Sequence, residues 1–106
     1  MDNQLKRGLL DVCVLAATAK RDTYGYQIIR DVSGCVDISE STLYPILRRL
    51  EAAGQLSVYS VEHNGRLRKY YRITDAGRQR LLEFTGEWSE LMKIYDYVTG
   101  EVDGNE

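Results

Sequence analysis

The sequence predicts a mainly α-helical domain with a single small β-hairpin. Three observations support this fold class: four stretches carry apolar residues at helical spacing, two strand-like stretches flank an Asn-Gly pair, and 43% of the residues are hydrophobic against 28% charged. Such a composition is typical of a globular chain rather than a disordered one. A length of 106 residues is enough for one compact core.

The first two predicted helices cover residues 4 to 19 and residues 24 to 32. The first is apolar nearly all round in its second half, as expected of a central helix. Gly8 interrupts it, which fits either close approach by another backbone or a tolerated glycine. Thr23 is the predicted cap of the second helix. A short connection then leads to a third helix, as in helix-turn-helix units.

The third predicted helix, residues 39 to 54, has one apolar and one polar face. Leucine and isoleucine side chains recur at i, i+3, i+4 and i+7, so that face must be buried. Ser39 or Ser41 caps the start, and Gly54 takes the left-handed conformation that ends the helix. Pro45 destabilises the helix less if the helix begins at Ser41, because proline then lies near the first turn. The predicted start is therefore either Ser39 or Ser41. Hydroxyls and two arginines on the polar face suit a nucleic-acid groove or an ordinary solvated surface.

A β-hairpin is predicted next, from residues 56 to 62 and residues 67 to 73 around the segment HNGR. Asn-Gly favours a tight turn because both of its central residues need positive φ. A helix-turn-helix followed by such a hairpin is a winged helix-turn-helix. The hairpin carries cations interleaved with tyrosines and offers a second surface to phosphates: Arg66, Arg68, Lys69 and Arg72.

A long last helix is predicted over residues 74 to 99, with Thr74 as its cap. Its apolar side chains repeat every 3.5 residues, the period of a coiled-coil seam: Leu81, Phe84, Trp88, Leu91, Tyr95 and Val98. This seam predicts a dimerisation helix. The alternative is that Phe84 and Trp88 pack on the first helix of the same chain. Residues 100 to 106 are expected to form a frayed polar tail.

Charge is unevenly distributed along the chain. Residues 1 to 73 hold 11 Lys and Arg against 8 Asp and Glu, and residues 74 to 106 hold 3 against 8, for a total net charge of −2. Because the local field decides what a groove attracts, the acidic part does not argue against a nucleic-acid partner. We expect a DNA-binding domain over residues 1 to 73, a dimerisation helix over 74 to 99 and a polar tail over 100 to 106.

Catalytic chemistry is poorly represented in the sequence. His63 is the single histidine, and Cys13 and Cys35 have neither metal-ligand nor redox spacing. We therefore expect no enzyme activity, cofactor, metal site or disulfide framework. We detect no signal peptide, and the longest apolar stretch, residues 12 to 17, is far too short to span a bilayer. These features predict a cytoplasmic protein without a membrane partner.

Three blocks of the sequence resemble the PadR-like family of transcriptional regulators, in its small subclass with a single C-terminal helix. The blocks are GYQIIRDV in the second helix, STLYPILRRLEAAGQL across the third helix and first strand, and RKYYRITDAG at the end of the hairpin. Together they cover most of residues 6 to 82. The resemblance implies a winged helix-turn-helix, a homodimer made largely through the last helix, operator DNA as the partner, and usually repression of transcription.

The resemblance also implies site residues. It places these at the major groove or its flanking phosphates and in the wing: Ser41, Thr42, Tyr44 and Arg48, then Arg66, Arg68 and Lys69. Hydroxyls near a helix N-terminus commonly bind phosphate, whereas Arg48 and Arg49 suit guanine edges. Because the region after Thr74 is short, we expect no separate effector-binding domain of the kind found in longer relatives. A small aromatic or hydrophobic effector would lie between two subunits, beside Phe84, Trp88 and Tyr95, where the same side chains equally suit interface packing.

The sequence thus predicts a sequence-specific regulator of double-stranded DNA, a repressor acting as a homodimer on an inverted-repeat operator and open to release by a small effector. The alternative is a winged helix that binds a partner protein without specific DNA binding, since a fold does not fix a function. Cations on both the third helix and the wing favour DNA. Salt-dependent retention on immobilised DNA would distinguish the two.

Overall fold

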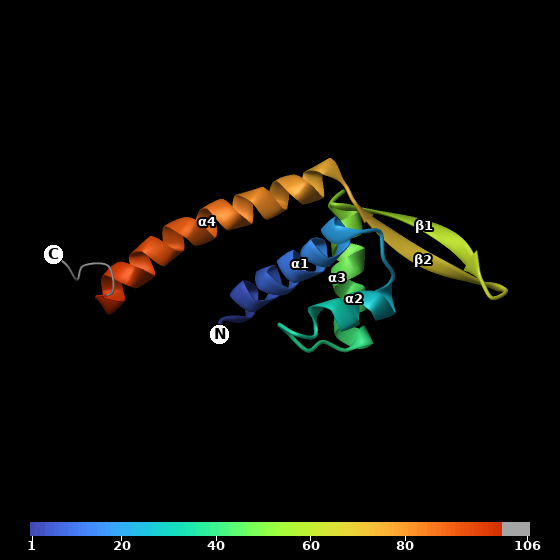
Figure 1. Ribbon diagram of the computed structural model, residues 1–106, viewed down its shortest axis with the longest axis horizontal. Helices are drawn as coiled ribbons and strands as arrows, with labels where there is room; N and C mark the ends of the chain where they lie inside the picture. Colours follow the sequence, from blue (N-terminus) through green and yellow to red (C-terminus); the bar gives the residue numbers. More distant parts are fainter. Residues whose placement is uncertain (101–106) are drawn as a thin grey trace.

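The computed structural model describes residues 1 to 100, which form four α-helices and one antiparallel hairpin (Figure 1). The elements in chain order are α1 (Asn3–Lys20), α2 (Gly25–Val32), α3 (Glu40–Ala52), β1 (Leu56–His63), β2 (Arg66–Ile73) and α4 (Asp75–Thr99). The first three helices make a compact body, from which the hairpin and α4 project in opposite directions. The molecule is 65 Å long but only 26 by 22 Å across. The predicted fold class is confirmed.

The core lies where α1, α2, α3 and the base of the hairpin meet. Its least exposed apolar side chains come from all three helices: Val14, Leu15, Ile28, Leu43, Leu47 and Leu50. Leu56, Tyr71 and Ile73 of the hairpin close it from one side. Burying one such side chain stabilises the fold by about 1.5 to 3 kcal/mol. The predicted apolar face of α3 therefore packs into the core, and the opposite face is exposed to solvent.

The helix α3 begins at the earlier of the two predicted starts. Ser39 is the N-cap, and its hydroxyl accepts a hydrogen bond from the backbone N–H of Thr42. Pro45 therefore lies in the second turn of the helix, where it removes one backbone hydrogen bond. Gly54 has a φ of 75°, so the predicted left-handed end is confirmed. Both ends of α3 are defined by local chemistry.

Thr23 does not cap α2, so this prediction is wrong. The helix follows Tyr24, whose side chain makes no capping hydrogen bond. The backbone of Thr23 instead exchanges two hydrogen bonds with Tyr71 of β2, with N–O distances of 3.2 and 2.7 Å. The open edge of β2 supplies a donor and an acceptor for an extended residue, and this outweighs a local cap. A backbone bridge therefore joins the hairpin to the helical body.

The hairpin turn follows the prediction. Asn64 and Gly65 have φ values of 52° and 79°, as a two-residue type I′ turn requires. Each strand is one residue longer at the tip than predicted, and Leu56 pairs with Ile73 at the base. The turn residues thus set the register of the whole wing.

The helix α4 is fixed at its start to the end of α3. Thr74 caps it as predicted, accepting a hydrogen bond from Gly77 N at 3.1 Å. The Thr74 hydroxyl donates to Gly54 O at 2.6 Å, and the Thr74 N–H donates to Gln55 O at 3.1 Å. From this joint, α4 runs back along α1 and continues past its N-terminal end (Figure 1). Gly100 ends it with a φ of 79°, and the remainder of the predicted tail lies outside the described residues.

Two further sequence features can be located. Within residues 1 to 100, no helix combines the length and the hydropathy needed to cross a membrane. Cys13 and Cys35 carry free thiols. Burial raises the pKa of Cys13, and the neighbouring Cys35 thiol raises it further. The two cysteines are therefore spatial neighbours, although they are far apart in sequence.

Candidate nucleic-acid interface

Ser41, Tyr44 and Arg48 form an exposed row on the face of α3 that points away from the core, and we call it the recognition row. Its spacing of three and four residues aligns the side chains along one side of the helix. At the N-terminal end, the Ser41 and Ser39 hydroxyls are 2.9 Å apart, and Ser39 is 3.3 Å from the Thr42 hydroxyl. Hydroxyls and free N–H groups at a helix N-terminus are phosphate ligands.

Tyr44 connects the recognition row to the wing. A Cβ at Gly25 would lie only 2.9 Å from the Tyr44 hydroxyl, so this glycine makes room for the ring on α2. Tyr44, Arg68 and Lys69 line one groove between α2, α3 and the wing. Tyr71 also lines it, and burial raises the pKa of that phenol. The structure thus brings three of the predicted DNA-binding residues together.

Arg68 is held by aromatic stacking. Its guanidinium carbon lies 4.0 Å from the centre of the Tyr24 ring. Tyr24 meets Tyr70 edge-on at 5.5 Å, and Tyr70 stacks on Tyr59 at 5.7 Å. A cation over an aromatic face gains about 0.5 to 2 kcal/mol and is restricted in position. Arg68 is therefore a pre-oriented cation rather than a free surface side chain.

The predicted wing cations come from both faces of the hairpin, although Arg68 and Lys69 line the same groove. Arg66 and Arg68 are two residues apart on β2 and lie on the same side of the hairpin, whereas Lys69 lies on the other. Arg66 is exposed beside the turn. Arg72 has a different environment, with an ion pair to Asp22 at 2.9 Å and its guanidinium 5.1 Å from the Tyr59 ring. Arg72 thus attaches the wing to the segment before α2.

Asp22 is the polar counterpart of this attachment. It accepts hydrogen bonds from the Tyr59 hydroxyl at 2.6 Å and from Arg72 Nε at 3.0 Å. Both hydrogen bonds lower the pKa of the Asp22 carboxyl, and the bond from Tyr59 has the larger effect. The same contact raises the pKa of Tyr59. The wing is held at its outer side by charge-assisted hydrogen bonds and at its base by the apolar core.

Thr42 and Arg49 lie at the edge of α3 that faces α1. They line a second groove together with Lys6 and Arg7 of that helix. The Arg49 guanidinium donates to the carboxylate of Asp11, which is only 5% exposed. Adjacent arginines of α3 therefore have different environments, Arg48 in solvent and Arg49 in an ion pair. A contact between Arg49 and a guanine edge stays a prediction.

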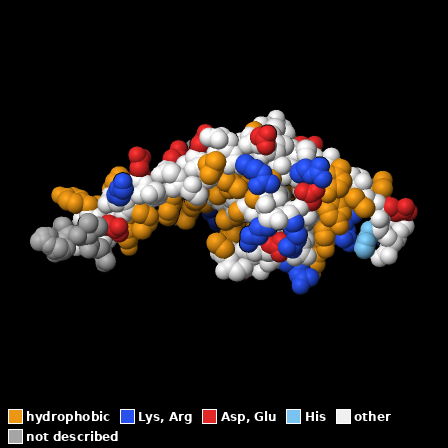
Figure 2. Space-filling view, turned by 45° about the horizontal axis from the view of Figure 1, so that its top comes forward, with side chains coloured by type: hydrophobic (Ala, Val, Ile, Leu, Met, Phe, Trp, Pro, Cys, Tyr) orange, Lys and Arg blue, Asp and Glu red, His pale blue; other side chains and the backbone are white. Residues whose placement is uncertain are grey.

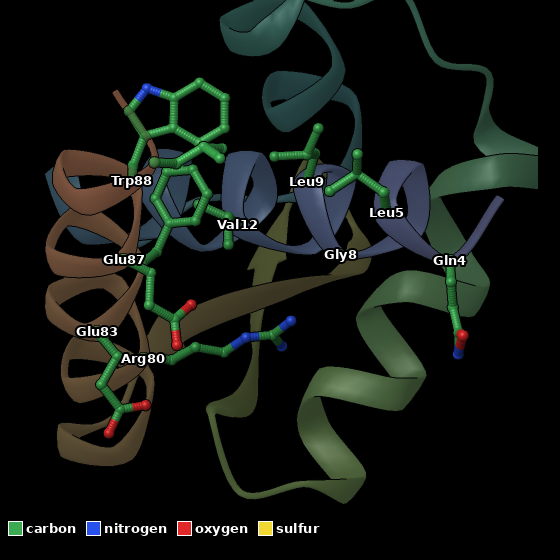
Figure 3. A pocket seen from close by; sticks show the side chains of 11 residues that line it. Gln4, Leu5, Gly8, Leu9, Val12, Arg80, Glu83, Glu87 and Trp88 are labelled. Atoms are coloured by element: carbon green, nitrogen blue, oxygen red, sulfur yellow. The ribbon is translucent and has the colours of Figure 1, made fainter. Parts of the chain in front are cut away.

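The predicted seam of α4 divides into two parts. Leu81 packs on the core, and the Phe84 and Trp88 rings stack at 5.8 Å. Across from them, α1 contributes an apolar wall, so that a groove lies between the two helices (Figure 3). This inner groove is lined mainly by Leu5, Gly8, Leu9, Val12, Arg80, Phe84 and Trp88. Phe84 and Trp88 therefore face α1 across this groove, and a dimer contact through them stays a prediction.

The outer part of the seam has no partner among residues 1 to 100. Tyr95 is 56% exposed and Val98 73%. The apolar side chains there form a continuous surface, which we call the outer apolar face: Trp88, Leu91, Met92, Ile94, Tyr95 and Val98. Figure 2 shows apolar side chains along the underside of the projecting helix and acidic side chains along its top. An exposed apolar face of this kind marks an interaction site.

Some residues of the interface were not identified from the sequence. Tyr24 and Tyr26 line the groove between α2, α3 and the wing. Tyr26 is 58% exposed, and the Arg30 guanidinium lies 5.9 Å from the centre of its ring. Helical periodicity assigns these positions only to a helix start. The pairing of Tyr26 with a cation four residues later, Arg30, was the available signal.

A helix-turn-helix with an exposed row of polar side chains that includes an arginine on its second helix, followed by a cationic hairpin, defines the class of winged-helix DNA-binding regulators. The sequence model described as "Transcriptional regulator PadR-like family" matches residues 14 to 83. The chain belongs to the PadR-like family and is accordingly a DNA-binding transcriptional regulator.

Relatives of known structure cover almost the whole chain. A crystal structure of smu.1704 from Streptococcus mutans is 45% identical with a TM-score of 0.78, covering 93% of this chain and 94% of that one. A PadR-like transcription factor from Bacteroides fragilis is 33% identical with a TM-score of 0.81, covering 90% and 94%. The transcriptional regulator Rv3488 of Mycobacterium tuberculosis is 33% identical, covering 85% of each chain. Coverage of 90% or more means that both solved structures match part of α4 as well.

Proposed function

We propose that this protein is a repressor that binds an inverted-repeat operator in double-stranded DNA as a homodimer. Residues 1 to 73 form the DNA-binding domain, and α4 joins the two subunits. One observation carries the proposal: the chain exposes the recognition row and a cationic wing on its body, and an unpaired apolar face on the helix that leaves it. The first surface fits DNA and the second fits another copy of the chain.

Within the DNA-binding surface we assign different roles to the cations. Arg48 is exposed at the middle of α3, where a guanidinium can donate twice to a guanine edge in the major groove. Ser41 and Thr42 bind phosphate at the start of the helix. Tyr44, Arg68 and Lys69 line the groove beside the wing and bind the flanking backbone, and Arg66 does so at the wing tip. Arg48 specifies the sequence, and the others position the protein.

The dimer follows from the outer apolar face. Leu91, Tyr95 and Val98 continue the 3.5-residue seam on the outer apolar face of α4, a helix that projects past α1 (Figure 1), so two α4 helices can pair in a symmetric arrangement. A two-fold dimer presents one recognition helix per half-site. The half-site centres should then be about 10 bp apart, or a multiple of that spacing.

An effector site belongs to the same proposal. The inner groove is predominantly apolar, with Trp88 and Phe84 offering flat faces and Leu9 opposite them. A Cβ at Gly8 would meet nothing within 4 Å, so this side of α1 leaves space rather than close backbone contact. We assign this groove, which lies within one subunit and not between two subunits as predicted from the sequence, to a small aromatic or hydrophobic effector that releases the repressor from its operator.

The decisive experiment is selection of preferred DNA from a random pool, followed by transcription in vitro from a promoter carrying the selected site. We expect a palindromic sequence and lower transcription with the protein present. A preferred site without two-fold symmetry would contradict the dimeric arrangement. Absence of any sequence preference would instead support a winged helix that binds a partner protein.

The assignment of roles is tested with arginine variants of matched size. Arg48→Ala should change which base is preferred, at a cost of about 1 to 3 kcal/mol for the original site. Arg66→Ala should weaken binding to all sequences alike and reduce the salt slope by about one unit. Arg78, exposed on α4, provides the control, and Arg78→Ala should change neither property. If Arg66→Ala altered sequence preference and Arg48→Ala did not, the roles would be reversed.

A further inference from the structure

Asp11 stands out because, within residues 1 to 100, it is the only charged side chain that is buried. Its two carboxylate oxygens bind different helices. Oδ1 accepts from Arg49 of α3, and Oδ2 accepts from Arg80 of α4 at 3.4 Å. One carboxylate of α1 therefore bridges the recognition helix and the helix that carries the outer apolar face.

Stability alone does not explain this arrangement. Burying a carboxylate costs free energy, and well-packed apolar residues often hold helices together as well as a buried ion pair does. The Arg49 and Arg80 side chains remain about one-third exposed, at 31% and 30%. The cluster thus keeps two cations at the surface and ties both to one buried anion.

Arg80 connects this cluster to the inner groove. Its guanidinium also donates to Gln55 Oε1 at 3.0 Å, directly after α3. Figure 3 shows the Arg80 side chain reaching from α4 into the space between α1 and α3, on the same wall as Trp88 and Glu87. A change in the groove wall that moves Arg80 must alter its hydrogen bonds to both Asp11 and Gln55.

The joint between α3 and α4 makes such a change transmissible. A Cβ at Gly77 would lie 2.4 Å from Gln55 O, so the backbones of the two segments are in close contact. With Thr74 hydrogen-bonded to Gly54, α4 has little freedom at its base. A displacement of α4 against α1 therefore reaches α3 through Arg80, which binds both Gln55 and Asp11, and through the ion pair of Asp11 with Arg49.

We propose that the Arg49–Asp11–Arg80 cluster couples the inner groove to the recognition helix, with Asp11 and Arg80 as positioning residues for DNA binding. Occupation of the groove draws Arg80 away from Asp11. The Asp11 carboxylate then binds Arg49 alone, which alters the orientation of Arg49 and of the edge of α3. This inference rests on the DNA-binding surface proposed above. Coupling is reciprocal, so DNA bound at α3 must also change the groove.

Trp88 allows this reciprocity to be measured without knowing the effector. It is the only tryptophan, it lines the inner groove, and it is 42% exposed. Its emission is recorded during titration with the selected operator and with a scrambled duplex, at concentrations where sedimentation shows dimer throughout. The variants are Arg80→Gln and Asp11→Asn, with Arg78→Gln on the same helix as the matched control.

We expect the parent protein and Arg78→Gln to change their emission as the operator binds. Arg80→Gln should bind DNA with the parent's unfolding temperature but without that emission change, and its preference for operator over scrambled DNA should fall by about threefold or more. Asp11→Asn should behave alike. Because loss of a buried carboxylate can unfold the domain, the test rests on Arg80→Gln, which leaves Asp11 paired with Arg49.

The outcomes separate the two proposals. If the parent binds its operator but its Trp88 emission stays constant, or if Arg80→Gln keeps the parent's emission change and preference, the coupling is overturned and the DNA-binding proposal stands. If no duplex is bound in a sequence-dependent way, the proposed function itself fails. A lower unfolding temperature in Arg80→Gln with unchanged preference would make the cluster structural only.

Discussion

The apolar side chains of α3 and α4 differ in how far they are buried within the chain. Four apolar residues of the 13-residue α3 are buried within the chain, whereas Gly77 is the only buried residue in the 25-residue α4. Both helices have a regular apolar pattern in the sequence. The difference shows that periodicity indicates a face to be covered but not which chain covers it. For α3 the cover is the core, whereas residues 1 to 100 leave the outer apolar face of α4 uncovered.

The largest expected effect is on a pair of leucines, one from each helix. Leu47 is 1% exposed and Leu91 46%. Leu47→Ala should lower the free energy of unfolding by about 2 to 5 kcal/mol, because it leaves a cavity in the core. In dilute protein that is monomeric, Leu91→Ala should lower it by less than about 1 kcal/mol. Urea unfolding followed by circular dichroism measures both, and similar losses would erase the contrast between the helices.

Trp88→Ala should produce the next largest effect, on association rather than folding. Central tryptophans at interfaces commonly contribute about 2 kcal/mol or more, so the dimer dissociation constant should rise by about 30-fold or more. Operator affinity should fall with it, because two half-sites are bound together only by a dimer. Sedimentation at micromolar concentration gives the dissociation constant.

A second aromatic residue of α4 serves as the control for Trp88. Tyr97 is 78% exposed and lies outside the outer apolar face. Tyr97→Ala should leave the dimer intact. An unchanged dimer in Trp88→Ala would place this residue outside the interface.

Local chemistry explains which parts of this fold are predictable from the sequence. The cap at Ser39, the left-handed Gly54 and the Asn64-Gly65 turn each depend on a few neighbouring residues, and all three agree with the structure. Thr23 was misassigned because its partner, Tyr71, lies almost fifty residues away. Local rules cannot weigh a cap against a backbone pairing with a distant strand.

The candidate site shows the same limit. The exposure of Arg48 follows from helical spacing. In contrast, nothing in the sequence indicates that the next residue, Arg49, pairs with Asp11. That pairing depends on how α1 crosses α3. The separation of Arg68 from Lys69 onto two sides of the wing was implicit in strand alternation, yet the stacking of Arg68 on Tyr24 required the packed structure.

Two glycines of α4 sharpen the contrast between its inner and outer parts. A Cβ at Gly77 would lie 2.4 Å from Gln55 O and 2.7 Å from the Ile73 side chain, whereas one at Gly86 would meet nothing within 4 Å. Gly77→Ala should therefore destabilise the fold by about 1 to 3 kcal/mol. Gly86→Ala should stabilise it by up to about 1 kcal/mol through helix propensity. Thermal unfolding of dilute protein measures both changes in stability. Equal changes would mean that the start of α4 at Gly77 is packed no more tightly than the helix around Gly86.

The smallest expected effect concerns the wing, which is attached to the body partly through Asp22. Tyr59 and then Arg72 lower the pKa of this carboxyl through hydrogen bonds, so its folded-state pKa lies below the unfolded value of about 4. A lowered pKa stabilises the fold fully above the unfolded value, and this contribution is lost as pH falls through the folded one. Asp22→Asn should thus be less stable than the parent at pH 7, and the difference should close below about pH 4. Because the Asp22 side chain is 31% exposed, the difference should be small.

Tyr59 provides the control for the charge of Asp22, because its hydrogen bond is the strongest cause of the lowered pKa. Tyr59→Phe removes that bond and leaves the carboxyl beside Arg72. Replacing Asp22 by asparagine should therefore cost less stability at pH 7 in the Tyr59→Phe background than in the parent, as urea unfolding of the four proteins measures. A stability difference between Asp22→Asn and the parent that persists undiminished to about pH 3 would mean that Asp22 acts through its hydrogen-bonding shape and not through its charge.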